Sequence, residues 1–264
     1  MVTNKIYQGD CLELMKQIED KSIDLILCDL PYGTTACKWD TIIPFEPLWE
    51  QYKKIIKDNG AIVLTASQPF TSALVMSNIK MFKYEWVWIK PQGVDPFMAK
   101  IRPLNNTEDI LVFGNKTNYF PQRQVGKPYH IIRDKNPRIK ETNNAVMKQT
   151  ETTNNGDRLP TRTLYFKQEK GLHPTQKPVA LFEYLIKTYT NEGDLVLDNC
   201  IGSGTTAIAC IRTNRKYIGI EIDLDYCKIA EERIQKELSQ SKLKSESIFP
   251  PKPEGMGIQN VKLI

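Results

Sequence analysis

Residues 195–207 read LVLDNCIGSGTTA, and this stretch decides the fold. Three apolar residues are followed by a Gly-rich turn and then by a run that can open a helix, which is the order strand, tight turn, helix. Gly202 and Gly204 allow the backbone to turn sharply and to come close to a ligand. Thr205 and Thr206 bring hydroxyl donors to the start of the helix. The stretch therefore predicts a ligand-binding loop at the edge of an α/β sheet.

An acidic residue follows the loop at an informative distance. Glu221 lies 17 residues after Gly204, near the end of the next predicted strand. An acid at that place can accept hydrogen bonds from both ribose hydroxyls, which favours an adenosine-containing ligand. A Gly turn needed only for close strand–helix packing is the alternative. A Walker-type phosphate loop is excluded because no Lys-Ser/Thr follows the second Gly, whereas a nicotinamide or flavin ligand stays open.

The position of this loop in the chain predicts the order of the strands. Only one strand follows Gly204, so the other strands of the sheet must come from the N-terminal part. Strands alternate with helices, which is typical of a mostly parallel, doubly wound α/β sheet. We therefore expect this sheet in permuted order, with N-terminal strands beside C-terminal ones. The expected strands are 5–10, 23–28, 61–65, 84–89, 109–113, 195–197 and 217–222, and the expected helices are 12–18, 46–57, 69–80, 178–189, 205–212 and 225–238.

A second segment, DLPYG at residues 29–33, directly follows the apolar run IDLILC. Ligands of open α/β sheets bind at the carboxyl ends of the strands, so the Asp29 carboxylate is expected at the rim of the site. Pro31 fixes the backbone and offers a carbonyl acceptor, and Tyr32 adds an aromatic face. This set suits a planar amine such as the Watson–Crick edge of adenine. A turn that merely leaves the strand is the alternative.

The positive charge of the chain is concentrated in residues 115–170. This stretch holds 12 Lys/Arg and 5 Asp/Glu, a net charge of +7, whereas the rest holds 24 and 26. It is rich in Asn, Gln, Thr and Pro, which is typical of a functional insertion. A polyanionic partner is the natural interpretation, because basic side chains fix phosphates and read guanine. The candidate nucleic-acid-binding residues are Arg123, Lys127, Arg133, Arg138, Lys140, Arg158 and Arg162.

The bulk composition is that of one globular domain with an inserted subdomain. The chain has 264 residues, 41% hydrophobic and 25% charged, and no apolar run approaches the ~20 residues of a membrane span. We therefore expect a cytoplasmic protein. The six cysteines form no CxxC pair and the only histidines are His130 and His173, so we expect reduced thiols and no metal site. At least one of Trp86 and Trp88 is expected in the core.

Three motifs carry a resemblance to a known family. Asp29-Leu30-Pro31-Tyr32 resembles the Asp-Pro-Pro-Tyr motif of the DNA amino-methyltransferases, which act on adenine N6 or cytosine N4. Residues 198–206 resemble their Asp-Pro-Phe-x-Gly-Ser-Gly-Thr-Thr loop. The segment HPTQKP at 173–178 matches the one that precedes this loop in the permuted β group. Gly9-Asp10-Cys11 and YIGIEID at 217–223 are also similar to family elements.

The resemblance implies a Rossmann-like, S-adenosylmethionine-dependent methyltransferase fold with an inserted target-recognition region. The implied parts are a catalytic half at 1–114, a DNA target-recognition insertion at 115–170, a cofactor-binding half at 171–238 and a flexible C-terminal tail at 239–264.

The family pattern also implies roles for single residues. Glu221 would hold the cofactor ribose, Asp10 and Cys11 would lie near its adenine, and Thr175 and Lys177 would meet its methionine end. Asp29, Pro31 and Tyr32 would be the catalytic residues. The full implied cofactor-binding set is Asp10, Cys11, Asp29, Thr175, Lys177, Asp198, Asn199, Cys200, Gly202, Ser203, Gly204, Thr205, Thr206, Glu221 and Ile222.

Two departures from the family pattern stand out. Asn199 and Cys200 replace the Pro and Phe of the family loop, and the loss of that ring predicts weaker cofactor packing in the absence of DNA. Leu30 replaces the first Pro of the Asp-Pro-Pro-Tyr motif, at a position that we expect to tolerate it.

The function that the resemblance implies is site-specific methylation of adenine N6 in double-stranded DNA. The target adenine would be flipped out, because its amino nitrogen is otherwise hidden by pairing, and the methyl group would pass directly to it. Cytosine-C5 chemistry is excluded because the chain has no Pro-Cys pair. The first-position Asp29 favours adenine, since cytosine-N4 members more often carry Ser there.

Three alternatives stay open: a cytosine-N4 methyltransferase, a nicotinamide-dependent oxidoreductase and a non-catalytic DNA-binding protein. Family members are often homodimers and often belong to restriction–modification systems. The chain itself carries neither a dimer signature nor a nuclease segment.

Overall fold

The computed structural model describes residues 1–34, 40–94, 96–133, 150–169 and 176–248. The elements up to residue 113 are β1 (Lys5–Gln8), α1 (Cys11–Met15), β2 (Ile23–Asp29), α2 (Phe45–Ile55), β3 (Ile56–Ala66), α3 (Phe70–Ser77), β4 (Phe82–Val94), η1 (Pro96–Met98) and β5 (Asn105–Phe113). Those that follow are β6 (Gln124–Val125), β7 (Tyr129–Arg133), β8 (Thr150–Asn154), β9 (Asp157–Arg158), β10 (Thr163–Tyr165), α4 (Val179–Tyr189), β11 (Leu195–Asp198), α5 (Thr205–Arg212), β12 (Lys216–Glu221) and α6 (Leu224–Ile248).

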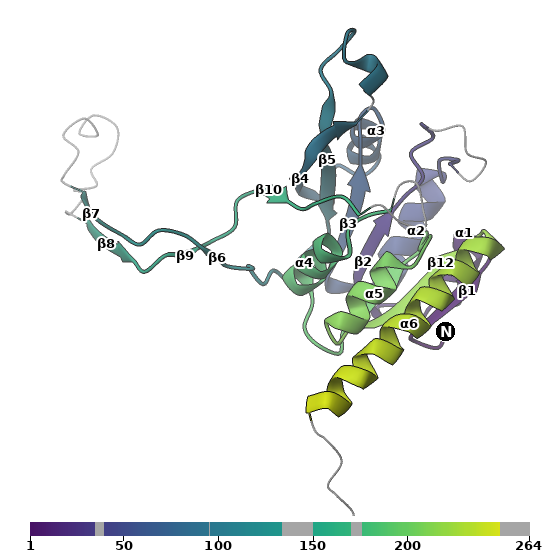
Figure 1. The fold of residues 1–264 in the computed structure, drawn as a ribbon. Helices are drawn as coiled ribbons and strands as arrows, with labels where there is room; N and C mark the ends of the chain where they lie inside the picture. Colours follow the sequence, from purple (N-terminus) through teal and green to yellow (C-terminus); the bar gives the residue numbers. More distant parts are fainter. Residues whose placement is uncertain (35–39, 95, 134–149, 170–175, 249–264) are drawn as a thin grey trace, which may run out of the picture.

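The central sheet has eight strands in the order β1–β12–β11–β2–β3–β5–β4–β10 (Figure 1). All neighbours are parallel except the two pairs that involve β5. The strand β2, from the N-terminal part, lies directly beside β11, from the C-terminal part. This pairing confirms the permuted order, and it brings the ends of two strands far apart in the sequence to one edge of the sheet.

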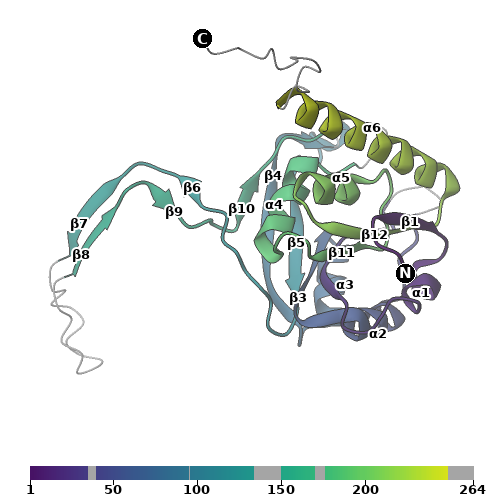
Figure 2. The same cartoon turned by 90° about the horizontal axis from the view of Figure 1, so that it is seen from below.

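Helices cover both faces of the sheet, as a doubly wound fold requires. One apolar cluster packs α4, α5 and α6 against one face, and a second packs α1, α2 and α3 against the other (Figure 2). Neighbouring residues of β11 pack into different clusters: Val196 packs into the first cluster and Leu197 packs into the second. Trp86 and Trp88 are both buried in the first cluster, which confirms the expected core position of at least one of them.

An arm of two short antiparallel ribbons extends away from the sheet (Figure 1). The ribbons pair β6 with β9 and β7 with β8. The predicted insertion at 115–170 is broader than this arm. Asn118 and Phe120 still donate backbone hydrogen bonds to the domain body, and β10 joins the main sheet beside β4. Only the middle of the insertion therefore projects.

The last helix is longer than its sequence pattern predicts. It was expected to end at residue 238, but α6 continues to Ile248. Residues 239–248 are mostly Ser, Lys and Glu, which carry little apolar periodicity yet do not break a helix, and Pro250 follows. The predicted flexible tail is thus helical in its first ten residues. Neither α6 nor any other helix of the described ranges is long and apolar enough to cross a membrane.

Candidate active site

The two segments that the sequence singles out meet at one cavity. The carboxyl ends of β2, β11 and β12 lie at the same edge of the sheet, and beside them is a cavity of about 1220 Å³. This is room for two medium-sized ligands side by side. The predicted site residues that line the cavity are Asp10, Cys11, Asp29, Pro31, Tyr32, Lys177, Asp198, Asn199, Cys200, Gly202, Ser203, Thr205, Thr206, Glu221 and Ile222.

Two of the predicted cofactor residues are not in that set. Thr175 lies outside the described residues. Gly204 lies at the start of α5 with a left-handed backbone, φ +85°, but it does not line the cavity. A Cβ at Gly204 would come within 3.0 Å of the Ala230 Cβ on α6. This glycine therefore serves close packing of α5 on α6, which is a helix–helix contact and not the strand–helix packing considered as the alternative for the Gly turn.

Glu221, at the end of β12, is positioned to hold a ligand. Its carboxylate accepts hydrogen bonds from the backbone N–H groups of Gly202, at 2.8 Å, and of Asp223, at 2.9 Å. Burial raises the pKa of Glu221, although these backbone donors oppose the shift. A carboxylate held from both sides keeps lone pairs for a further donor, such as a ribose hydroxyl.

Asp198, at the end of β11, anchors the Gly-rich loop. It accepts hydrogen bonds from the Thr206 hydroxyl and, at 3.1 Å, from the backbone N–H of Cys200. Burial raises the pKa of Asp198 to about 7, against the effect of these donors. The folded protein thus holds the proton more tightly than the unfolded chain. The resulting stabilisation is complete below about pH 4 and is lost as the pH rises toward 7.

Replacing Asp198 by asparagine is expected to flatten the pH dependence of stability. The free energy of unfolding of the wild type should fall by about 2 kcal/mol more than that of Asp198→Asn between about pH 5 and pH 7.5. Urea denaturation of both proteins at the two pH values measures the difference. An equal fall in the free energy of unfolding for both proteins between the two pH values would contradict the assigned pKa of Asp198.

Asn199, which departs from the family pattern, has a buried hydrogen-bond partner on α2. Its side-chain oxygen accepts a hydrogen bond from the hydroxyl of the buried Tyr52, on α2, at 2.5 Å. Cys200 is partly exposed and lines the cavity with Cys11. Asp10 caps α1 through the backbone N–H groups of its first turn. The weaker cofactor packing expected from Asn199 and Cys200 stays a prediction.

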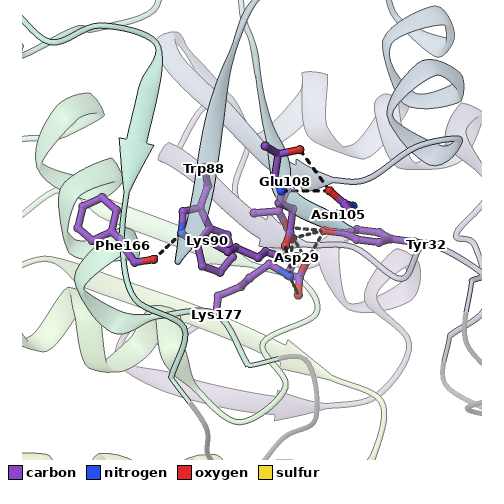
Figure 3. Close-up of polar contacts among 10 residues, drawn as sticks. Asp29, Tyr32, Trp88, Lys90, Asn105, Glu108, Phe166 and Lys177 are labelled. Carbon is purple, nitrogen blue, oxygen red and sulfur yellow. Dashed lines mark hydrogen bonds and ion pairs between the residues drawn. The ribbon is translucent and has the colours of Figure 1, made fainter. Parts of the chain in front are cut away.

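The predicted catalytic segment, residues 29–33, contributes to a dense polar network (Figure 3). Asp29 Oδ1 accepts hydrogen bonds from the Tyr32 hydroxyl, at 2.8 Å, and from the Thr65 hydroxyl. Asp29 Oδ2 pairs with Lys177 Nζ at 2.7 Å. The Tyr32 ring stacks on Phe70 with 5.1 Å between centroids and 25° between planes. Asp29 is therefore fixed in position from three sides.

Lys177 contacts the carboxylate of Asp29, the predicted catalytic residue, and it also lines the cavity. Its ammonium lies between Asp29 Oδ2 and Glu108 Oε1, at 2.7 and 2.8 Å. Burial alone would lower the pKa of Lys177, but the charges of Asp29 and Glu108 outweigh burial and raise it well above its ordinary value. The predicted contact with the methionine end of a cofactor stays a prediction. The structure adds that this lysine is a charged member of the polar network around Asp29 and Glu108.

Glu108 and Lys90 are site residues that sequence reasoning missed. Glu108 is buried on β5, and Lys90, on β4, pairs with its Oε2 at 2.7 Å. Both residues line the cavity. Burial raises the pKa of Glu108, but the ammonium groups of Lys177 and Lys90 overcome this effect and lower it. The available signal was the polar pair Glu108-Asp109 directly before the apolar run ILVF.

Among the candidate DNA-binding residues of the described ranges, Arg123, Lys127, Arg133 and Arg158 lie in or next to the ribbons of the arm, whereas Arg162 lies beside β4 of the main sheet. Several of them make contacts within the chain. Arg123 pairs with Asp157 at 2.5 Å and Arg162 with Glu85 at 3.0 Å. Arg158 donates to Asn154 and to the Lys127 carbonyl. Lys127 is exposed, and Arg133 ends β7. Arg138 and Lys140, like His173, lie outside the described residues.

The fold and the cavity together define a Rossmann-like methyltransferase with a permuted order of strands. The chain belongs to the DNA methylase family, whose model matches residues 23–232. It is 29% identical to the type II methyltransferase M.HpaI of Haemophilus parainfluenzae, over 88% of this chain and 74% of that protein. It is 30% identical to the DNA adenine methyltransferase YhdJ of Escherichia coli, over 87% and 82%.

A solved structure supports the same assignment. The complex of M1.HpyAVI with S-adenosylmethionine superposes with a TM-score of 0.59 at 26% identity, over 87% of this chain and 98% of that one. The protein is thus an S-adenosylmethionine-dependent DNA methyltransferase, as the motifs predicted. The nicotinamide oxidoreductase alternative is wrong.

Proposed function

We propose that this protein transfers a methyl group from S-adenosylmethionine to the exocyclic N6 of a flipped adenine in double-stranded DNA. The observation that carries the proposal is the placement of Asp29 and Tyr32 on the same cavity as the Gly-rich loop, at the ends of neighbouring strands. A target base and a methyl donor can therefore occupy adjoining parts of one cavity.

The residues at the loop fit an adenosine-type cofactor. A Cβ at Gly202 would meet only the Cys200 carbonyl, at 4.0 Å, so the backbone there is open to close approach. The side-chain oxygen of Gln176 is buried without a hydrogen-bond partner among the described residues, and this residue lines the cavity. We assign the ribose to Glu221, the adenine to the side of Asp10 and Cys11, and the methionine end to the side of Lys177.

The catalytic residues act by orientation and electrostatics. The Asp29 carboxylate and the Pro31 carbonyl accept hydrogen bonds from the target amine, and the Tyr32 ring supports the base. These acceptors draw the nitrogen lone pair out of conjugation and stabilise the positive charge that develops on the nitrogen. When bound, the cofactor would supply an electrophilic methyl group on a sulfonium. The target nitrogen would take this methyl group directly as the carbon–sulfur bond breaks and leaves a neutral thioether, and the methylated amine would then lose one proton to solvent. No covalent bond to the protein is required.

Methylation of unmodified DNA with methyl-labelled S-adenosylmethionine tests the proposal. Digestion to nucleosides and mass spectrometry should find the label in N6-methyladenine. Label in N4-methylcytosine would overturn the choice of base, and the absence of label from DNA would leave the non-catalytic DNA-binding alternative. Mapping methylated positions in DNA from cells that express the protein then identifies the recognition site.

DNA affinity is expected to fall steeply with salt. Residues 115–170 carry a net charge of +7, and each phosphate contact releases counterions on binding. If about three to six phosphates are neutralised, log Kd should rise with log salt with a slope of about 3–5. Fluorescence anisotropy on duplex DNA over a series of salt concentrations measures this slope. A flat response would count against the arm as a DNA-binding element.

A further inference from the structure

We propose that Glu108 is a positioning residue for methyl transfer. By sharing the Lys177 ammonium and the Tyr32 hydroxyl with Asp29, it keeps an acceptor site of the Asp29 carboxylate available to the target amine. This inference rests on the proposed function, because it concerns the same amine and the same carboxylate.

The geometry places Glu108 against two of the three side-chain donors that hold Asp29. Lys177 Nζ is 2.7 Å from Asp29 Oδ2 and 2.8 Å from Glu108 Oε1. The Tyr32 hydroxyl is 2.8 Å from Asp29 Oδ1 and 3.0 Å from Glu108 Oε1. Figure 3 shows Asp29, Tyr32, Glu108 and Lys177 gathered in one cluster of polar contacts. Two of the three side-chain donors to Asp29 thus also lie within reach of Glu108, and the third, Thr65, contacts Asp29.

Asp29 and Glu108 compete for these donors, because the donors cannot serve both carboxylates fully at once. A phenol has a single proton, so Tyr32 can donate fully to only one carboxylate at a time. An ammonium placed between two carboxylates likewise divides its attraction between them. The negative charge of Asp29 is therefore less fully neutralised than it would be if Lys177 and Tyr32 contacted Asp29 alone. A less compensated carboxylate is a stronger acceptor for an incoming amine.

Lys90 offsets the cost of burying the second carboxylate of the network, that of Glu108. Its Nζ pairs with Glu108 Oε2 at 2.7 Å and lies 4.9 Å from the centre of the Trp88 ring. The four groups Asp29, Lys177, Glu108 and Lys90 then alternate in sign and sum to zero charge. A lone buried carboxylate would instead be costly. The pairing with Lys90 leaves Oε1 of Glu108 to Lys177 and Tyr32.

Removing the charge of Glu108 should therefore make Asp29 a weaker acceptor for the target amine. It should leave the affinity for the cofactor nearly unchanged. In Glu108→Gln, Lys177 loses one of its two anions and turns to Asp29 alone, and the Tyr32 proton follows. The amine then competes with a fully engaged Lys177 for the same Oδ2. In Glu108→Asp the negative charge is kept on a side chain shorter by one carbon, so most of the sharing is preserved.

The test measures the single-turnover rate of methyl transfer to DNA at saturating cofactor and DNA, and cofactor affinity by calorimetry. We expect Glu108→Gln to lower the rate about 10- to 100-fold, with cofactor Kd within about two-fold of the wild type. Glu108→Asp should recover most of the lost rate. The control is Asp109→Asn, the next residue on β5, which does not line the cavity and accepts a hydrogen bond from Thr71. Its rate should stay close to that of the wild type.

Two results would overturn the inference. One is a Glu108→Gln rate equal to that of the wild type. The other is an equal loss of rate and of cofactor affinity in both Glu108 variants, which is the mark of a purely structural role. A wild-type protein that binds S-adenosylmethionine but methylates no DNA would instead overturn the proposed function, so the two failures are distinguishable.

Discussion

Replacing Asp29 by asparagine is expected to lower the single-turnover rate of DNA methylation about 100- to 1000-fold. Asparagine has nearly the same shape, but its side chain carries no charge to stabilise the developing positive charge on the target nitrogen. The variant also leaves Lys177 with only Glu108 as its anionic partner, since the 2.7 Å ion pair to Asp29 is lost. Rapid-quench measurement with labelled cofactor and saturating DNA gives the rate.

A matched control exists on the same strand. Asp24, near the other end of β2, pairs with Lys57 at 2.6 Å and accepts a hydrogen bond from the Leu195 N–H at 2.9 Å. Asp24→Asn should reduce stability and leave the saturated rate within about two-fold of the wild type. A variant Asp29→Asn that methylates DNA at a normal rate would remove Asp29 from the catalytic assignment.

Replacing Glu221 by alanine is expected to weaken S-adenosylmethionine binding about 100-fold. The carboxylate supplies the proposed acceptors for the ribose, and it also holds the Gly202 N–H at 2.8 Å. Its loss leaves the Gly202 and Asp223 N–H groups without their acceptor and loosens the loop. Isothermal titration calorimetry without DNA measures the Kd.

Asp225→Asn is the control for this change. Asp225 lies on α6, only four residues away, but it does not line the cavity and its partner is the exposed Lys228, at 3.0 Å. The affinity of Asp225→Asn for S-adenosylmethionine should equal that of the wild type. At saturating cofactor, Glu221→Ala should regain much of the wild-type methylation rate, because Asp29 is intact. Unaltered affinity in Glu221→Ala would mean that the cofactor lies elsewhere in the cavity.

The architecture could be predicted because its signals are local in the sequence. Each of the two key segments follows an apolar run, and the place of the Gly-rich loop late in the chain leaves only one way to complete a parallel sheet. The pairing of Val196 with Leu25 confirms this inference. The cavity also gathers nearly all of the residues that the motifs singled out.

The polar network around Asp29 could not be predicted in full, because it depends on strand direction. Glu108 lies near the start of its strand, and it reaches the catalytic edge only because β5 runs antiparallel to β3. Apolar periodicity does not report direction. The ion pairs of Lys177 depend in turn on Glu108, and the hydrogen bond of Asn199 depends on Tyr52, which is 147 residues away in the chain. These contacts are set by tertiary packing alone.

The pairing of β2 with β11 has a consequence for how the chain is made. Strand β11 begins about 165 residues after β2 ends. At about 5–20 residues per second, ribosomal synthesis needs about 10–30 seconds to cover that interval. During this time one edge of β2 has no partner, and an open edge strand is a template for pairing with other chains. The nascent N-terminal half therefore has an open β2 edge until its own last strands are synthesised.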